Sequence, residues 1–440
     1  THGPVITEIA TMMAAGPYRL PNLLVEGRTV YTNRTPAGST RAPSGPQVCW
    51  ALEQQVDALA DRVGMDSLEF RLHNLAEEGD EGPTGQRFEK IGVKESLVEA
   101  ARLIGWGKPV EPGEGLGLAV GWWFSAPGPS GCYIKLNADG SATLVTGAQE
   151  NGSGAVMGLA LLAADELGLP PERISLVYQD TDAGAFDWGS SGSQTTFNVG
   201  RAVIAASAKI RERLLRMAAE ELEANPDDLE LADGVVRAKD APSRSVSIAT
   251  LAGRAQDDGE LITGEGAPPA PPAPDSFGAS CVGRVSFPSF AAPAFFAHAA
   301  RVAVDRETGV VRVREVAAGH DFGRVINPLG AEGQVEGGIV HGLGIALSEG
   351  TVYRDGHQAN PGLLDYKLQT VADAPRMRIA FVDAPAAHGG PHGAKGVGEP
   401  PVVPTAAAVA NAIAAATGVH VRRLPMTPVR VWAALTGEEA

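Results

Sequence analysis

Cysteine is scarce in this chain of 440 residues, which contains Cys49, Cys132 and Cys281 and no others. Three widely spaced cysteines, an odd number, support neither a disulfide framework nor a cluster of metal ligands. We therefore expect a reducing, cytoplasmic environment in which each cysteine serves as a small buried apolar residue.

The chain also lacks an excess of positive charge and any run of about 20 strongly apolar residues. Its formal net charge of −16 argues against nucleic acid or an anionic membrane surface as the main partner. The apolar stretch at 406–416 is mostly alanine, which favours a packed helix over a lipid-facing one. The chain begins with Thr1, and no signal peptide is visible. With 44% hydrophobic and 20% charged residues, the composition is typical of a soluble globular protein of two or three domains.

Strand and helix signals are mixed along the chain. Apolar residues at helical spacing predict helices that include 52–63, 155–167 and 202–223, and Asp66 is placed to cap a further short helix. Alternating apolar residues around turn sequences predict hairpins at 133–145 and 301–313, and a strand at 174–177. The proline-rich stretch 264–276 is expected to be an extended loop, too short for a free tether between domains.

Four segments rich in glycine, serine and glutamine are expected to be loops where strands lead into helices. They are residues 38–47, 146–154, 188–196 and 333–344. Free backbone amides at a helix start favour an anionic ligand such as phosphate, although each segment alone is also typical of an ordinary turn or capping sequence. None is a GxxxxGK[ST] or GxGxxG motif. Together they indicate a large polar cofactor held mostly by backbone amides and neutral side chains.

A fifth segment, residues 393–401, places Glu399 at the end of a glycine-rich turn and before two prolines. Glycine lets a backbone approach a bulky ligand closely, and proline stiffens the exit of the turn. This turn, which we call the Glu399 turn, could therefore mount a general base, or it could be an exposed surface loop.

Other conspicuous residues have both a structural and a functional interpretation. The set comprises His341 as a packed or cofactor-adjacent histidine, Glu150 and Glu336 as hydrogen-bonded loop carboxylates, Asp180 and Asp182 as turn residues, and Trp122, Trp123 and Phe124 as core residues or the wall of a substrate funnel.

These motifs in this order resemble the molybdenum-binding large subunit of the xanthine dehydrogenase/aldehyde oxidoreductase family of molybdenum hydroxylases. The stretch 38–47 resembles the family's "RGxGxPQ"-type loop, and 395–401 resembles its "KGxGEPP" turn. The resemblance covers nearly all of the chain. It implies an α+β fold of mixed sheets with packed helices, in which 1–115 is the C-terminal part of a first molybdopterin-binding domain and 116–440 is the second.

The resemblance also implies roles for individual residues. Glu399 would be the catalytic base that takes a proton from a molybdenum-bound hydroxyl, and Arg41 would orient substrate or stabilise developing charge. The cofactor would be held by Gly152, Ser153, Gly154, Ser193, Gln194, Thr195, Gln334, Lys395, Gly396, Val397 and Gly398, with no protein ligand to the metal, which the pterin dithiolene holds. Ser153 stands where the family has glutamine. Pro43 and Ala42 replace the stacking phenylalanine of xanthine oxidases and the cysteine of molybdenum–copper carbon monoxide dehydrogenases.

Several partners follow from the same resemblance. The cofactor is expected to be molybdenum-molybdopterin, with the cytosine dinucleotide form as one option. No cysteine set for [2Fe–2S] clusters is present, so [2Fe–2S] and FAD are expected on partner subunits. The first half of the large subunit would come from another polypeptide, unless cleavage or a chain boundary accounts for Thr1. The expected reaction is hydroxylation of an electron-poor carbon in an N-heterocyclic aromatic compound; an aldehyde oxidoreductase, a reductive variant acting on a coenzyme A thioester and a non-catalytic scaffold are the alternatives.

Overall fold

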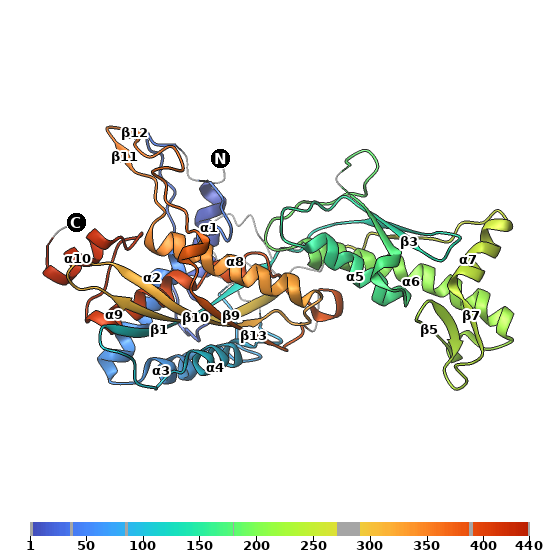
Figure 1. Cartoon of the computed structure of the whole chain (residues 1–440), viewed down its shortest axis with the longest axis horizontal. Coiled ribbons are helices and arrows are strands. Elements are labelled where there is room, and N and C mark those ends of the chain that lie inside the picture. Colours follow the sequence, from blue (N-terminus) through green and yellow to red (C-terminus); the bar gives the residue numbers. More distant parts are fainter. Residues whose placement is uncertain are drawn as a thin grey trace.

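The computed structural model describes residues 3–35, 38–83, 87–178, 180–270, 291–386 and 390–438. They form two lobes that lie side by side along the long axis of the molecule (Figure 1). One hydrophobic core is built from residues between 9 and 126 together with residues between 294 and 431, and the other from residues between 132 and 262. Both ends of the chain therefore build the first lobe, and the middle of the chain builds the second. The domain division at 115/116 remains a prediction.

The first lobe contains a four-stranded sheet in the order β1 (Glu114–Ser125), β9 (Ala291–Val304), β10 (Val311–Asp321) and β13 (Arg376–Val382). The β1–β9 and β9–β10 pairs are antiparallel, and β10–β13 is parallel. Helix α4 (Val93–Ile104) packs on β9, β10 and β13, and helix α9 (Thr405–Thr417) packs on β1 and β9. Of the described residues, the segment 400–417 is long and apolar enough to cross a membrane, but 78% of it is buried in the protein. This confirms the predicted packed alanine-rich helix.

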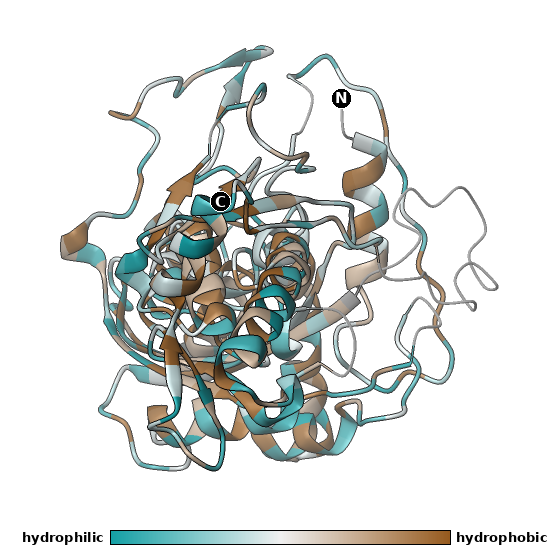
Figure 2. Ribbon diagram, turned by 90° about the vertical axis from the view of Figure 1, so that its right-hand side faces the viewer, coloured by the Kyte–Doolittle hydropathy of each residue, from teal (hydrophilic) through white to brown (hydrophobic). Residues whose placement is uncertain are grey.

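The second lobe contains a four-stranded sheet in the order β4 (Ile174–Val177), β3 (Ala142–Thr146), β2 (Cys132–Leu136) and β8 (Thr263–Gly266). Helix α6 (Thr195–Leu222) packs on β2 and β8 and against helix α5 (Ala155–Leu167). A small antiparallel sheet lies at the far end, formed by β5 (Leu229–Ala232), β6 (Val235–Ala238) and β7 (Ser245–Ser247) beside α7 (Ile248–Asp257). Seen from that end, the helices carry apolar and polar stripes, as expected when one face is buried (Figure 2).

The remaining elements surround these sheets. They are α1 (Gly3–Met13), α2 (Gly45–Val63), α3 (Ser67–Asn74), α8 (Pro328–Leu347), α10 (Pro428–Thr436), the hairpin β11 (Tyr353–Arg354) and β12 (His357–Gln358), and short 3-10 turns at Pro171–Arg173, Pro226–Asp228, Val371–Asp373, Pro391–Gly393 and Pro400–Val402. This mixture of helices and mixed sheets confirms the predicted α+β class.

Most of the predicted elements are present. Asp66 caps α3 by accepting hydrogen bonds from the backbone N–H groups of Leu68 at 2.8 Å and Glu69 at 3.2 Å. Both hairpins, the strand at 174–177 and the helix at 155–167 are confirmed. Helix α6 begins at Thr195 and not at about 202, because residues 195–201 continue the helix and bury Phe197 and Val199. The predicted loop at 264–276 is wrong at its start, since Gly264–Gly266 pair with β2 in β8, and 271–276 lie outside the described residues, as does Cys281.

The glycine-rich stretch 333–344 was expected to be a loop, and this prediction is wrong because it lies inside α8. Its glycines make room for a neighbouring segment. A Cβ atom on Gly338 would lie 2.4 Å from Cβ of Pro401, and one on Gly342 would lie 2.5 Å from Cβ of Thr405. These two glycines are four residues apart and so share one helix face. Helix α8 therefore packs closely against the segment that follows Glu399.

Candidate active site

A cavity of about 890 Å³ opens where the two lobes meet, within the size range of small-molecule and cofactor sites. Its walls come from the loop before α2, the loop before α5, the segment 188–196, the start of α8 and the Glu399 turn. Of the thirteen predicted site residues, twelve line it: Arg41, Gly152, Ser153, Gly154, Ser193, Gln194, Thr195, Gln334, Lys395, Val397, Gly398 and Glu399. The structure thus brings together residues that are far apart in the sequence.

Glu399 is half-buried in the wall of this cavity, immediately before the 3-10 turn Pro400–Val402. Its Oε2 atom accepts hydrogen bonds from Nε1 of Trp123 at 2.9 Å and from Oγ of Ser193 at 2.8 Å. Its Oε1 atom accepts one from the backbone N–H of Ala42 at 3.2 Å. The carboxylate is therefore held from three separate segments of the chain.

Opposing effects act on the proton affinity of Glu399. Burial raises the pKa of this carboxyl above its ordinary value, because the charged form is poorly solvated. The hydrogen bonds from Ser193, Trp123 and Ala42 lower the pKa, as does the positive charge of Arg41, but burial outweighs them. A carboxylate with a raised pKa suits a general base, since it can take up a proton at moderate pH.

Arg41 ties the Glu399 turn to helix α8. Its Nε donates to the carbonyl oxygen of Gly398 at 2.5 Å, and its Nη2 donates to both the carbonyl oxygen and Oε1 of Gln334, at 3.2 Å each. Gln334 in turn donates from Nε2 to the carbonyl oxygen of Gly152 at 3.5 Å. Arg41 and Gln334 thus link three walls of the cavity. The role expected for Arg41 toward substrate remains a prediction.

The Glu399 turn passes very close to Ser193, and this explains a glycine. A Cβ atom on Gly396 would lie 2.6 Å from Cβ of Ser193. The backbone N–H of Gly396 donates to Oγ of Ser125 at 2.9 Å, so Gly396 faces the protein and does not line the cavity. Gly396 therefore permits a close approach between the Glu399 turn and the segment before α6.

Comparisons with known proteins agree with this geometry. Residues 98–375 match a family model described as a molybdopterin cofactor-binding domain, and residues 1–75 match a second model of the same description. The chain belongs to the xanthine dehydrogenase/aldehyde oxidoreductase family of molybdenum-binding subunits.

Relatives in this family are considerably longer than this chain. It is 31% identical to the xanthine dehydrogenase molybdenum-binding subunit of Escherichia coli O157:H7, over 98% of this chain and 58% of the relative. It is 30% identical to subunit gamma of the 6-hydroxypseudooxynicotine dehydrogenase complex of Paenarthrobacter nicotinovorans, over 99% of this chain and 56% of the relative. The chain thus spans a little over half the length of these relatives.

Solved structures of the same family share the fold. The aldehyde oxidoreductase of Desulfovibrio gigas superposes with a TM-score of 0.79 at 28% identity, over 99% of this chain and 46% of that one. Quinoline 2-oxidoreductase of Pseudomonas putida 86 superposes with a TM-score of 0.86 at 24% identity, over 98% of this chain and 57% of that one.

The cavity walls fit the family's cofactor. A Cβ atom on Gly152, Gly154 or Gly158 would meet no other atom within 4 Å, so these backbones face open space that a bulky group can occupy. No group of three or more His, Cys, Asp or Glu side chains within the described ranges could hold a metal ion. An organic group that carries the metal would fit the open space beside these glycines, in a wall that contains the charged side chains of Arg41 and Arg324 beside neutral ones.

The start of helix α5 does not present the free backbone N–H groups that the sequence predicts there. Oε1 of Glu150 accepts from the backbone N–H of Gly154 at 3.0 Å, and Oε2 of Glu150 accepts from that of Val156 at 3.4 Å. A carboxylate thus already occupies the anion site of this helix end, which confirms Glu150 as a hydrogen-bonded loop residue. Contacts between Gly152–Gly154 and the cofactor remain a prediction.

Two predicted cofactor residues have side chains that are engaged inside the protein. Nζ of Lys395 lies 2.6 Å from Oδ2 of Asp321 and 3.1 Å from the carbonyl oxygen of Lys90, in a buried ion pair. Gln194 is fully buried, donates to the carbonyl oxygen of Gly189 and accepts from Asn198. Any contact that these two residues make with a cofactor through their backbones remains a prediction.

Other residues of the cavity wall were not expected from the sequence. Arg324 is exposed there and has no recorded ion pair within the described ranges, and Trp188 is 47% exposed. Val5 and Ile9 of α1 add an apolar wall. A single arginine after a glycine, or two apolar residues in a short helix, gives no signal that would distinguish a cavity wall from ordinary surface or core.

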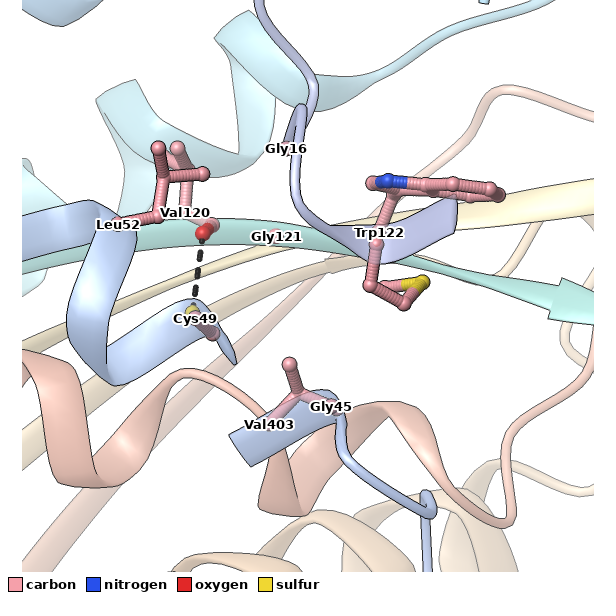
Figure 3. A pocket seen from close by; sticks show the side chains of 9 residues that line it. Gly16, Gly45, Cys49, Leu52, Val120, Gly121, Trp122 and Val403 are labelled. Carbon is pink, nitrogen blue, oxygen red and sulfur yellow. Dashed lines mark hydrogen bonds between the residues drawn. The ribbon is translucent and has the colours of Figure 1, made fainter. Parts of the chain in front are cut away.

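The space beside Trp122 is far smaller than this cavity. A small void of about 10 Å³ is lined by Met13, Gly16, Gly45, Cys49, Leu52, Val120, Gly121, Trp122 and Val403 (Figure 3). Sγ of Cys49 donates to the carbonyl oxygen of Val120 at 3.4 Å. The void has room for about one water molecule and is not a ligand site. Cys49 and Trp122 therefore belong to the core, as the structural interpretation predicts.

Proposed function

We propose that this chain is the molybdenum-cofactor-binding catalytic subunit of a multisubunit hydroxylase. The observation that carries the proposal is the carboxylate of Glu399, half-buried in the wall of a large cavity and held by three hydrogen-bond donors. A catalytic base needs this combination of fixed position and raised proton affinity.

When bound, the cofactor supplies a Lewis-acidic metal that exchanges two electrons with the substrate. Glu399 accepts a proton at its carboxylate. Arg41 holds the backbone of the Glu399 turn through Gly398, and Gln334 links Arg41 to the loop at Gly152. Val5 and Ile9 exclude water from one side of the cavity. The glycine backbones at 152–158 leave the room that the cofactor requires.

The substrate proposed is an N-heterocyclic aromatic compound that is purine-, pyridine- or quinoline-like. An apolar wall of Val5, Ile9 and Pro43 suits a planar ring. Relatives named for xanthine and 6-hydroxypseudooxynicotine support the same class. An aldehyde is the alternative, since a relative at 30% identity is named aldehyde oxidoreductase.

Electrons are proposed to leave this subunit through other subunits. A [2Fe–2S] protein and an FAD protein would carry the electrons onward, and another polypeptide or segment would supply the remainder of the large subunit. The pterin is proposed to carry either no nucleotide or cytosine nucleotide, and the complex to be cytoplasmic. Relatives that are themselves named as subunits of complexes support this assembly.

The test is purification of the native complex, followed by metal and pterin analysis and a substrate screen with an artificial electron acceptor. Molybdenum, pterin and turnover of an N-heterocycle are expected. Turnover of aldehydes alone would favour the alternative substrate. A complex without molybdenum after expression in a host that makes the cofactor would instead support a scaffold, and would contradict the proposal.

A further inference from the structure

We propose that Trp123 and Ser193 are positioning residues that dedicate one oxygen of Glu399, Oε1, to proton transfer. This inference rests on the proposed role of Glu399 as base and adds which of its atoms receives the proton. It also assigns a role to Trp123 that differs from the core packing or substrate funnel considered from the sequence.

The two oxygens of Glu399 have different hydrogen bonds. Oε2 accepts two, from Trp123 at 2.9 Å and Ser193 at 2.8 Å. A carboxylate oxygen has two lone pairs, so Oε2 is saturated. Oε1 accepts the longer bond from the Ala42 N–H at 3.2 Å, with no second donor recorded from the described part of the chain. Oε1 therefore retains a lone pair that can take a proton without breaking a bond.

Trp123 is fixed strongly enough to act as a positioning group. It is 1% exposed, lies in β1 of the four-stranded sheet in the first lobe and stacks on Phe124 with 4.8 Å between ring centroids. A Cβ atom on Gly45 would lie 2.9 Å from the indole ring, so the start of α2 closes the other side. The indole N–H is a donor only, and it cannot follow the carboxylate if that group turns.

Ser193 holds the same residue at a second point. Its hydroxyl donates to Oε2 of Glu399 and accepts from the backbone N–H of Glu399 at 3.0 Å. Its backbone has a left-handed conformation, with φ of 55°, which a residue other than glycine adopts at a cost in conformational energy. The serine thus fixes both the main chain and the side chain of the base.

Few charged groups affect the pKa of Glu399. Arg41 is the charged group that acts on it within the described residues, and it comes from the loop before α2. His341, on α8, interacts with Glu349 and Arg41. The protonation of Glu399 is therefore governed by its three donors, by Arg41 and by burial.

The first test needs no cofactor. In the full chain labelled with ¹⁵N at its indole nitrogens, the Trp123 resonance is identified by its loss in Trp123→Phe, and its shift is followed against pH. We expect one inflection above pH 4.5 that disappears in Glu399→Gln, and an indole N–H that stays protected from exchange on the acidic side. Loss of that protection below the inflection would place the proton on Oε2 and overturn the proposal, as would a Trp123 resonance that does not titrate.

The second test uses the loaded complex. Removing a donor from Oε2 disfavours the charged carboxylate, so its pKa rises. Trp123→Phe and Ser193→Ala should each move the acid limb of kcat/KM upward by about one pH unit. The matched control is Trp122→Phe, because neighbouring side chains on a strand point to opposite faces and Trp122 lies at the small core void.

Failure of the positioning roles and failure of the proposed function would give different results. An acid limb that does not move in either variant, while Glu399→Gln is inactive, contradicts the positioning roles alone. An active Glu399→Gln enzyme contradicts the proposed function, whatever the indole titration shows. If Trp123→Phe does not fold, Ser193→Ala measures the same shift.

Discussion

At the residue scale, the Glu399 turn carries two kinds of charged group with different tasks. Glu399 faces the cavity, whereas Lys395, four residues earlier, faces Asp321 in the core. Asp321 also accepts from the backbone N–H groups of Gly92 at 2.9 Å and Gly323 at 3.1 Å, so the ion pair is completed by the main chain. The lysine of the turn therefore anchors the loop that presents the glutamate.

Replacing Lys395 should cost substantial stability. Lys395→Met leaves the buried carboxylate of Asp321 without its partner, and we expect a loss of about 3–5 kcal/mol in the free energy of unfolding. Denaturant unfolding measures this loss. The control is Lys90→Met, whose exposed pair with Glu78 should contribute about 0–1 kcal/mol. Equal effects of the two variants would contradict an anchoring role for Lys395.

Sequence reasoning could place Glu399 but not its partners. Glycines and prolines on both sides mark a stiff turn, and the family resemblance supplies its role. Trp123 lies 276 residues away in the chain, inside an apolar strand sequence where an indole is as expected in a core as in a site. Hydrogen bonds between distant segments depend on strand register and loop path, and a single sequence does not reveal either.

At the element scale, helix α8 shows how the same composition can have two interpretations. Repeated glycines in 333–344 predict a loop, yet the main-chain hydrogen bonds of a helix persist when a neighbouring segment packs against the bare backbone. Gly338 and Gly342 are required at the contact with Pro401 and Thr405. Tertiary packing thus overrides the weak helix propensity of glycine here.

Adding a methyl group on each side of α8 tests this account. Gly342→Ala would place Cβ 2.5 Å from Cβ of Thr405, and overpacking should cost about 1–3 kcal/mol of stability. Gly337→Ala in the same helix is exposed and would meet nothing within 4 Å, so it should stabilise the protein by up to about 1 kcal/mol. Thermal or denaturant unfolding distinguishes the two, and destabilisation by both would contradict the contact.

A buried histidine pair joins the four-stranded sheet of the first lobe to α9. Nε2 of His298 in β9 lies 3.0 Å from Nε2 of His320 in β10, and Nδ1 of His298 lies 3.0 Å from Oγ1 of Thr405 in α9. Burial lowers the pKa of His298 to about 3 and also lowers that of His320. Both rings are therefore neutral in the folded protein at moderate pH, whereas unfolding lets them protonate near pH 6.5.

The pH dependence of stability follows from this difference. The folded state binds fewer protons below pH 6.5, so stability is fully present above that value and falls as the pH drops toward 3. Each histidine contributes a slope of up to about 1.4 kcal/mol per pH unit. His298→Gln should reduce the slope measured between pH 7 and 5, whereas the exposed His357→Gln should not. An unchanged slope in His298→Gln would contradict a depressed pKa.

At the scale of the whole molecule, the site lies where the two lobes meet and needs both of them. The second lobe supplies residues 151–158 and 188–196, and the first lobe supplies Arg41, the start of α8 and Glu399. The chain spans a little over half the length of the two relatives described above. The complete catalytic unit is therefore proposed to include further polypeptide. Sequence order predicted which segments converge, but not that Gln334 and Arg41 link them.

The most direct test of the central claim is single-turnover reduction of the cofactor-loaded complex by substrate, compared between the native complex and Glu399→Gln. The exposed Glu336→Gln, on α8 outside the cavity wall, is the matched control. We expect Glu399→Gln to keep its molybdenum and pterin but lose reduction by at least about two orders of magnitude, as for removal of a general base, while Glu336→Gln reacts normally. Full reduction in Glu399→Gln with the cofactor still bound would contradict the claim.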